Sequence, residues 1–324
     1  MALTRRAGHT ERSIRHVDAG DAVLQASRMQ HRREKRQRRF VAFVAIIVNI
    51  ALVAVIGIAS MKSIERRNAM RNISVGQAYA ELQQVRVKPR FADDKGGILL
   101  SNSGYGRRAP GAPTIEIYTD PMCPGCAVLH QQMDTVFRSL LDAGQINLSI
   151  HPVTFLDHMS SDGYSTRAGN AIAYISSEDS NPDHLIDFMS NLYSSEFQPR
   201  EGSQYNPVSD DAIKQQMTKA GIDPVMAGKA MTGGYGPWLE ASTRYTQRRK
   251  DLADKTGQFA GKITTPTIVI NNSKLNINTM SDEGFTYEEA IMQSLGLNSD
   301  AIGQSGSMPS IGANGKPGVA GMTA

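Results

Sequence analysis

The 324-residue sequence has very little cysteine: Cys123 and Cys126 are the only two. This scarcity excludes a framework of several disulfide bonds. It also argues against a structural zinc site, which normally takes four ligands, because there is no second cysteine pair and no closely spaced pair of histidines. A bridge between the two would close a very short loop and constrain the unfolded chain little. A reversible dithiol/disulfide pair is therefore favoured over a structural disulfide, a partial zinc site that includes His130, or two inert thiols.

The cysteines lie at the junction of a predicted strand and a predicted helix. Residues 114–118 favour a strand, and apolar residues recur at helical spacing from about residue 124 to 143. A cysteine in the first turn of a helix faces unpaired backbone N–H groups and the positive end of the helix dipole, which favour the thiolate. Cys123 is thus predicted to be the nucleophile. Cys126, one turn further along, is predicted to resolve a mixed disulfide by attacking Cys123.

Charged residues are absent from residues 40–60. A helix over this segment would be about 31 Å long at 1.5 Å per residue, and a bilayer has a hydrocarbon core of roughly 30 Å. We predict a single transmembrane helix here. A cleaved signal peptide is the alternative, although the preceding basic region is long for one.

The positive charge of the chain is concentrated before this apolar segment. Residues 1–39 hold eleven Lys and Arg against four Asp and Glu, a net charge of +7, which leaves −3 for the rest of a chain whose total is +4. Basic residues are retained on the cytoplasmic side of membranes, so residues 1–39 are predicted to be cytoplasmic and the residues after 60 extracytoplasmic. In that orientation the basic segment contacts the lipid bilayer, and a nucleic-acid partner is not expected.

The remaining sequence predicts one folded domain between two polar segments. Residues 61–95 are predicted to form a stalk, residues 96–297 an α/β domain with a helical insertion at about 160–257, and residues 298–324 a disordered tail. Around the cysteines a β-α-β unit is expected, with strands at 97–100, 114–118 and 146–151. After the insertion, Pro266 stands at the start of a β-branched strand, where it either begins the strand or follows a cis peptide bond. Asn271 and Asn272 then supply a hairpin turn into a strand at 274–277, and a closing helix follows at 286–295.

Three features together resemble the DsbA-like thiol-disulfide oxidoreductases of the thioredoxin superfamily. They are the Asp-x-x-Cys-Pro-x-Cys turn at residues 120–126, the helical insertion, and the Thr265-Pro266-Thr267 strand with its hairpin. The resemblance covers roughly residues 96–296. It implies a thioredoxin-like α/β fold and a cis proline at Pro266 beside the cysteines. It also implies that the backbone of Thr265 pairs with the substrate backbone, and that no cofactor or metal is required.

The resemblance also implies a function. Pro124, the first residue between the cysteines, is similar to the oxidase branch, whereas Gly125 stands where the best-known oxidases have histidine. The implied activity is oxidation of reduced exported proteins, with reoxidation by a membrane partner. A reductase or isomerase on the same scaffold is the first alternative, and a membrane-anchored binding or chaperone module with non-catalytic cysteines is the second.

Three further titratable residues were weighed as members of the site. Many relatives carry a buried acid six residues before the first cysteine, where this sequence has Ile117, and Glu116 is one position out of register, on the opposite face of the strand. His130 and His151 are each expected to be structural histidines. The predicted site is therefore the Cys123–Cys126 pair supported by Pro124, Gly125, Thr265 and Pro266.

Overall fold

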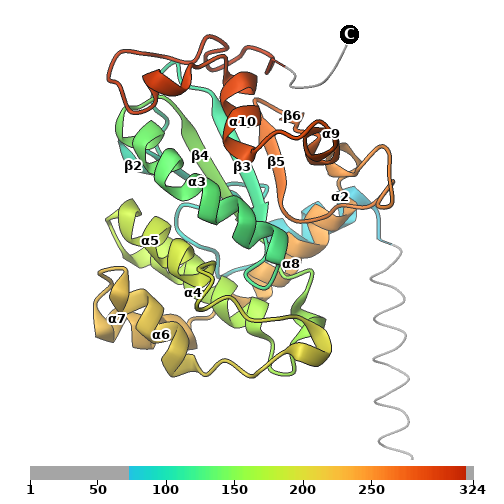
Figure 1. The fold of residues 1–324 in the computed structure, drawn as a ribbon. Helices are drawn as coiled ribbons and strands as arrows, with labels where there is room; N and C mark the ends of the chain where they lie inside the picture. The colour runs from blue at the N-terminus through green and yellow to red at the C-terminus, as the bar shows by residue number, and fades with distance from the viewer. Residues whose placement is uncertain (1–72, 319–324) are drawn as a thin grey trace, which may run out of the picture. The chain divides into compact units, whose positions relative to one another are not determined.

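A six-stranded sheet forms the centre of the described part of the chain, residues 73–318 of the computed structural model (Figure 1). The strand order is β2-β1-β4-β3-β5-β6; β3 and β4 are parallel, and every other neighbouring pair is antiparallel. The strands are β1 (Ile98–Ser101), β2 (Gly104–Tyr105), β3 (Thr114–Thr119), β4 (Asn147–Pro152), β5 (Thr267–Ile270) and β6 (Ser273–Lys274). The two central strands are β4 and β3, and the carboxyl end of β3 leads directly into the cysteine turn.

Alternation along β3 divides its side chains between the two faces of the sheet. Ile115 and Ile117 are fully buried, and Ile117 lines the same apolar layer as Phe137 of helix α3 (Pro124–Asp142). Burial of one such side chain contributes about 1.5–3 kcal/mol. Glu116 and Tyr118 point to the other face, since successive strand residues alternate in direction.

Helices cover the sheet and fill the long connection between β4 and β5. Helix α10 (Tyr287–Leu295) packs against α3, and α5 packs against α3 from the inserted region. The inserted helices are α4 (Tyr164–Glu178), α5 (Pro182–Leu192), α6 (Asp210–Lys219), α7 (Pro224–Thr232) and α8 (Gly236–Arg248). Short 3₁₀ turns occur at η1 (Asp157–Met159), η2 (Gly202–Gln204), η3 (Lys250–Leu252) and η4 (Ser299–Ala301). This mixed arrangement confirms the predicted α/β fold class.

The structure corrects the predicted stalk from Ser74 onward. Helix α2 (Val75–Gln84) begins with a capping box at Ser74 and packs on α8. Its Ala78 and Leu82 are buried, and Tyr79 lies with its ring centroid 5.3 Å from that of Tyr245. The two buried residues lie one turn apart on the face of α2 that packs against α8, and α8 supplies the rest of that contact surface.

The predicted disordered tail is also corrected, for residues 298–318. The side chain of Gln145 donates to the carbonyl oxygens of Ala301 and Ser307, at 2.7 and 2.5 Å, and that of Asn271 donates to Gly312 and Gly315, both at 2.9 Å. The backbone carbonyl groups of this segment are thus held by hydrogen bonds from two amide side chains, the buried Gln145 and the half-buried Asn271, rather than by apolar burial. Its low apolar content was therefore a poor guide to its order.

Two smaller differences concern helices. Helix α7 was not predicted, and the chain after β6 forms helix α9 (Ile277–Asp282) where a strand was predicted to continue to residue 277. The hairpin turn itself is as predicted, because Asn271 and Asn272 have φ of 45° and 68°, the left-handed values that such a turn requires.

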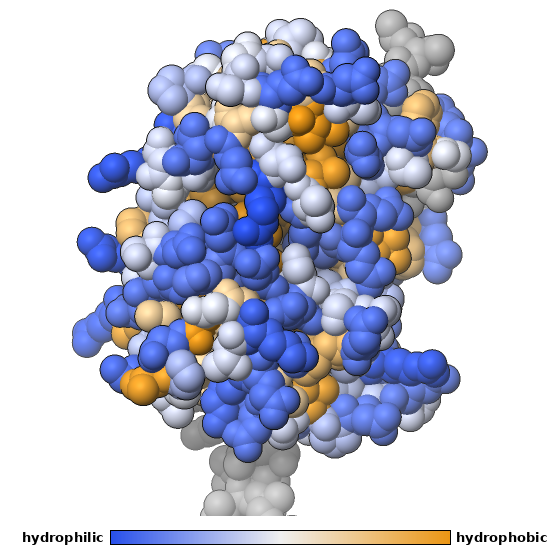
Figure 2. Space-filling view, turned by 60° about the vertical axis from the view of Figure 1, so that its left-hand side comes forward, coloured by the Kyte–Doolittle hydropathy of each residue, from blue (hydrophilic) through white to orange (hydrophobic). Residues whose placement is uncertain are grey.

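Among residues 73–318, no helix is both long and apolar enough to cross a membrane. The transmembrane helix predicted at residues 40–60 and the basic segment before it lie outside the described residues. On the face drawn in Figure 2, hydrophilic residues predominate and apolar side chains appear in small separate groups. The large apolar side chains that are exposed are correspondingly scattered along the chain: Val75, Val87, Val128, Val225, Phe259 and Met308.

Candidate active site

The turn between β3 and α3 is held by the buried carboxylate of Asp120. Its oxygens accept hydrogen bonds from the Met122 N–H at 2.9 Å, the Leu156 N–H at 2.8 Å and the Ser165 hydroxyl at 2.6 Å. Burial raises the pKa of Asp120 to about 6, although these hydrogen bonds oppose the shift. Asp120 thus ties the cysteine turn to the start of the helical insertion, because Ser165 lies in α4.

The chain leaves this turn at Cys123, the N-cap of α3, with Pro124 as the first helical residue. Proline suits this position because its missing N–H would have no partner within the helix. Cys123 is 6% exposed and Cys126 is completely buried, so only the first sulfur can be reached from solvent. The order of reactivity predicted from the sequence follows from this difference in access.

The strand that begins after Pro266 brings a second segment against the cysteines. The Thr265–Pro266 peptide bond is cis, and the Cys123 sulfur lies 3.1 Å from the Thr265 carbonyl oxygen. A Cβ atom added to Gly125 would stand only 3.1 Å from Cδ of Pro266 and 3.7 Å from the Cys123 sulfur. The structure therefore brings the predicted site residues together, and glycine at position 125 allows Pro266 to approach this closely.

The two thiols differ in their acidity. Hydrogen bonds from the side chains of Cys126 and Thr265 favour the thiolate of Cys123. They lower its pKa to about 7, although burial acts in the opposite direction. Burial, reinforced by the neighbouring Cys123, raises the pKa of Cys126 well above its ordinary value. Near neutral pH, Cys123 is consequently the more readily ionised thiol and Cys126 holds its proton.

This difference gives a direct expectation for chemical modification. In the reduced chain, the rate of alkylation of Cys123 by iodoacetamide should rise with pH and reach half its maximum at about pH 7, since only the thiolate reacts. Cys126 should stay unmodified until the protein unfolds. Peptide mass spectrometry of samples quenched at each pH measures both residues. A midpoint near 9, the value of an unperturbed thiol, would contradict the assignment of Cys123 as a stabilised thiolate.

Two further residues near the cysteines could not be predicted from the sequence. Gln198 donates a 2.9 Å hydrogen bond to the Met122 carbonyl from the connection after α5. Tyr287, the first residue of α10, is near enough that charge on the two cysteines contributes to raising its pKa to about 12, after the larger effect of burial. Both come from elements far along the chain, so only the folded structure identifies them.

Glu116 and His151 belong to a different cluster, on the opposite face of the sheet. The Tyr118 hydroxyl donates to Glu116 at 2.9 Å, and Nε2 of His151 lies 3.6 Å from the same carboxylate oxygen. Arg249 donates to the Tyr118 hydroxyl at 2.6 Å, and the rings of Tyr118 and His151 stack. These contacts agree with the expected structural role of His151 and give Glu116 the same kind of role.

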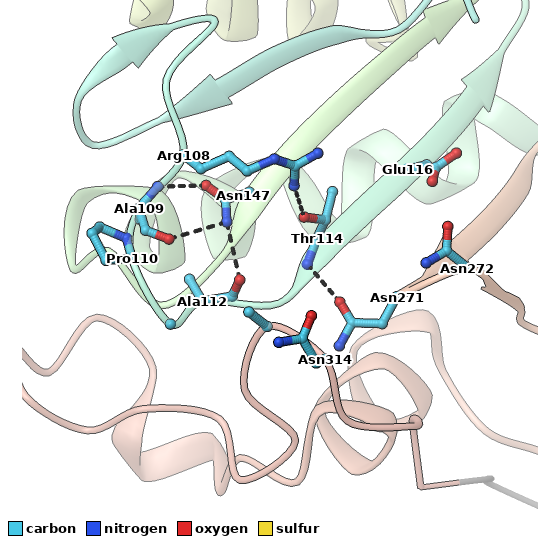
Figure 3. A pocket seen from close by; sticks show the side chains of 12 residues that line it. Arg108, Ala109, Pro110, Ala112, Thr114, Glu116, Asn147, Asn271, Asn272 and Asn314 are labelled. Carbon is cyan, nitrogen blue, oxygen red and sulfur yellow. Dashed lines mark hydrogen bonds between the residues drawn. The ribbon is translucent and has the colours of Figure 1, made fainter.

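An open pocket of about 390 Å³ lies at the other end of β3, away from the cysteines (Figure 3). Its amide side chains hold the surrounding loops: Asn147 accepts from the Ala109 N–H at 2.7 Å, and Asn271 accepts from the Thr114 N–H at 3.0 Å. These polar groups are already engaged, which assigns the pocket to loop support. Within the described residues, no group of three or more His, Cys, Asp or Glu side chains is arranged to hold a metal ion.

Comparison with known proteins gives one family and several more distant likenesses. A family model described as thioredoxin matches residues 108–287, more than half of the chain. Among curated proteins, the serine/threonine-protein kinase PknE of Mycobacterium tuberculosis is 28% identical over 176 residues, which are 54% of this chain and 30% of the kinase. The chain thus spans about a third of the length of the curated relatives that it matches.

The solved structures that it is similar to share less sequence. DsbA from Mycobacterium tuberculosis in its reduced form is 19% identical with a TM-score of 0.45, over 56% of this chain and 85% of that one. The thiol-disulfide oxidoreductase MdbA from Corynebacterium diphtheriae is 19% identical with a TM-score of 0.44, over 61% and 96%. At these identities the likeness concerns the fold alone.

Proposed function

Because the chain belongs to the thioredoxin family, we propose that it is a protein thiol-disulfide oxidoreductase acting through Cys123 and Cys126. The observation that carries this proposal is the asymmetry of the pair. Cys123 caps a helix, reaches solvent and has a pKa lowered to about 7, whereas Cys126 is completely buried beneath it. An accessible thiolate backed by a buried thiol is the arrangement that disulfide exchange through a mixed disulfide requires.

The exchange proceeds in two displacements. A thiolate of the substrate attacks the sulfur of Cys123 in the Cys123–Cys126 disulfide; a new sulfur–sulfur bond forms, and Cys126 leaves with the electron pair. A second thiolate of the substrate then attacks its own sulfur in the mixed disulfide and displaces Cys123. The substrate is oxidised by two electrons and the enzyme is reduced to its dithiol. The substrate backbone is proposed to pair with the backbone of Thr265, whose carbonyl oxygen lies 3.1 Å from the Cys123 sulfur.

The proposed direction is oxidation of exported proteins. Pro124 between the cysteines and the predicted extracytoplasmic location support it, because disulfides persist outside the cytoplasm. The pKa of about 7 for Cys123 equals the value of about 7 in thioredoxin and lies well above about 3.5 in DsbA, so the proposed direction does not rest on this pKa. Net oxidation then requires a partner that removes electrons from the dithiol, proposed to be a membrane protein.

Residues 40–60 anchor the enzyme in this proposal, with residues 1–39 cytoplasmic and the catalytic domain outside. The apolar length and the basic residues before it support this topology. Labelling of Cys123 with a membrane-impermeant maleimide, in intact cells whose disulfides have first been reduced with dithiothreitol, tests it, and protection of Cys123 until these cells are lysed would contradict it.

The reduction potential separates the oxidase from its first alternative. Equilibrating the chain in glutathione buffers and counting free thiols by mass-tagging should give a value between about −270 mV, that of thioredoxin, and about −120 mV, that of DsbA. Because the pKa of Cys123 matches that of thioredoxin, the expectation of a higher potential rests on Pro124 and on the predicted extracytoplasmic location. A value at or below about −270 mV would assign the chain to the reductases instead.

A further inference from the structure

A continuous polar chain runs from Cys126 into the layer between α3 and α5. The hydroxyl of Thr119, the last residue of β3, lies beside Cys126, where it favours the thiolate, and is 3.3 Å from Nε2 of His130. Nδ1 of His130 lies 2.7 Å from a carboxylate oxygen of Asp134. Thr119 and His130 are 0% and 3% exposed, so this chain crosses an otherwise apolar interior. Polar groups buried in this way are costly unless each is partnered, and here each is.

The donors and acceptors of this chain depend on the state of Cys126. The carboxylate of Asp134 accepts, so Nδ1 of His130 carries a hydrogen and Nε2 of the neutral ring is an acceptor for the Thr119 hydroxyl. The Thr119 oxygen then has lone pairs for two donors, and Tyr193 is one at 2.6 Å. In the mixed disulfide Cys123 no longer accepts the Cys126 hydrogen, so the Cys126 thiol becomes the second donor. Once Cys126 is a thiolate, the Thr119 hydroxyl donates to its sulfur, the direction that favours the thiolate.

The neighbours of His130 hold the imidazole in this orientation. The Tyr193 ring stacks on it with centroids 4.2 Å apart and an interplanar angle of 4°. Asp134 is fixed in turn by the Ser190 hydroxyl of α5, at 2.5 Å from its second oxygen. The Asp134 side chain is 12% exposed, so the end of the hydrogen-bonded chain that is farthest from Cys126 reaches solvent.

The cysteine pair requires a group that takes a proton from Cys126 and returns it. The pKa of the buried Cys126 is raised well above its ordinary value, yet this residue must lose its proton before it can attack a mixed disulfide and regain one after it leaves. Ile117 stands where many relatives carry a buried acid, and the contacts of Glu116 among the described residues are on the other face of the sheet. The Thr119–His130 chain is the polar path that the structure places at Cys126.

We propose that His130, acting through Thr119 and paired with Asp134, accepts the proton that Cys126 loses and returns it when Cys126 leaves as a thiolate. This inference rests on the proposed function. In the resolving direction, the Cys126 proton passes to Thr119 while the Thr119 proton passes to Nε2. The Cys126 thiolate then forms a bond to Cys123 and displaces the substrate thiolate. The product is an imidazolium beside the Asp134 carboxylate, with the Thr119 hydroxyl now donating to Cys126.

Other ionisable groups near His130 have defined partners of their own. On α3, Arg138 pairs with Asp187 and Asp183 of α5 rather than with Asp134. The groups that act electrostatically on the Cys126–Tyr193 region are Asp120 and Cys123, and Tyr287 of α10 senses the charge on both cysteines. Asp134 is accordingly the carboxylate that stabilises a positive charge on His130.

A single-turnover reaction with glutathione disulfide isolates the step. The reduced 324-residue chain in detergent first forms a Cys123–glutathione mixed disulfide, and Cys126 then releases glutathione in a second, unimolecular phase. His130→Gln keeps a polar side chain but cannot take up a proton. It should slow the second phase about 10²-fold at pH 6.5, the scale of general acid–base catalysis. The deficit should shrink as pH rises and hydroxide replaces the base. The first phase should change less than twofold.

Control variants separate proton transfer from packing. His184→Gln removes a histidine that pairs in the same way with Asp179, at 2.8 Å, in the helical insertion, and it should leave both phases unchanged. Thr119→Val removes the linking hydroxyl and should slow the second phase, whereas Thr119→Ser restores the hydroxyl and should restore most of the rate. The serine and valine pair keeps the test decisive even if His130→Gln does not fold.

Two results would overturn the proposal, and they are distinguishable. If both phases of the wild-type chain are normal and His130→Gln or Thr119→Val resolves within twofold of it from pH 6 to 9, the relay is wrong and the proposed function stands. If the wild-type chain shows neither phase, the proposed function itself fails and the relay fails with it.

Discussion

Replacing Cys123 with serine is expected to abolish disulfide exchange, by a factor of about 10³ or more in turnover. A serine hydroxyl cannot form a sulfur–sulfur bond, and Cys126 cannot substitute because it is completely buried. The measurement is the rate at which the chain oxidises a reduced, unfolded protein, followed by acid quenching and labelling of the remaining thiols.

This variant should remain folded, because its effect is on chemistry. Serine fits the space and can donate to the Thr265 carbonyl oxygen as the thiol does. The melting temperature should therefore move by less than about 4 °C, the shift that 1 kcal/mol produces in a domain of this size. Full turnover by a folded Cys123→Ser chain would contradict the mechanism. It would favour the alternative of a binding or chaperone module.

Replacing Cys126 with serine is expected to trap the substrate. The accessible Cys123 still forms a mixed disulfide, but no internal thiol is left to resolve it, so a covalent adduct should accumulate and multiple turnover should fall by about 10²-fold or more. Non-reducing electrophoresis of cell extracts, with mass spectrometry of the linked peptides, reports the adduct at Cys123.

Two controls and one contradicting result accompany the trapping experiment. They should disappear on treatment with dithiothreitol and should be absent from a chain that also carries Cys123→Ser. If Cys126→Ser yields no reducible adduct while the wild-type chain turns over normally, then Cys126 does not resolve the intermediate. The assignment of roles within the pair would then be wrong.

The sequence predicted the parts of the molecule whose determinants are local. Strand β3, helix α3 and the Asn271-Asn272 turn each follow from residues a few positions apart, through periodicity, capping and turn preference. The cis peptide before Pro266 came from resemblance, which carried the strand and the cysteines together. These elements meet at the candidate site, so its main residues could be proposed without the structure.

The parts that were missed depend on partners far away in the chain. Helix α2 is seated by Ala78 and Leu82 because α8, some 160 residues later, offers a matching surface. Residues 298–318 are ordered by hydrogen bonds to Gln145, a side chain that no hydropathy pattern marks.

The polar chain behind Cys126 was missed for the same physical reason. Thr119 and His130 are ordinary members of a strand and a helix in the sequence, and Tyr193 follows Thr119 by 74 positions. Only the packing of α5 against α3 brings them together. His130, expected from the sequence to be a structural histidine, then becomes a candidate for proton transfer.

The close approach of Gly125 and Pro266 limits how this enzyme can be altered, in evolution or by engineering. A side chain at position 125 would press on Pro266 from 3.1 Å as soon as it gained a Cβ atom. A substitution there would therefore change the surroundings of the Cys123 sulfur and the position of Pro266 at the same time, and the two effects could not be selected separately. A change in the charge of Asp120 would act on Cys123 separately, because that charge raises the pKa of Cys123 from the preceding turn and does not touch Pro266.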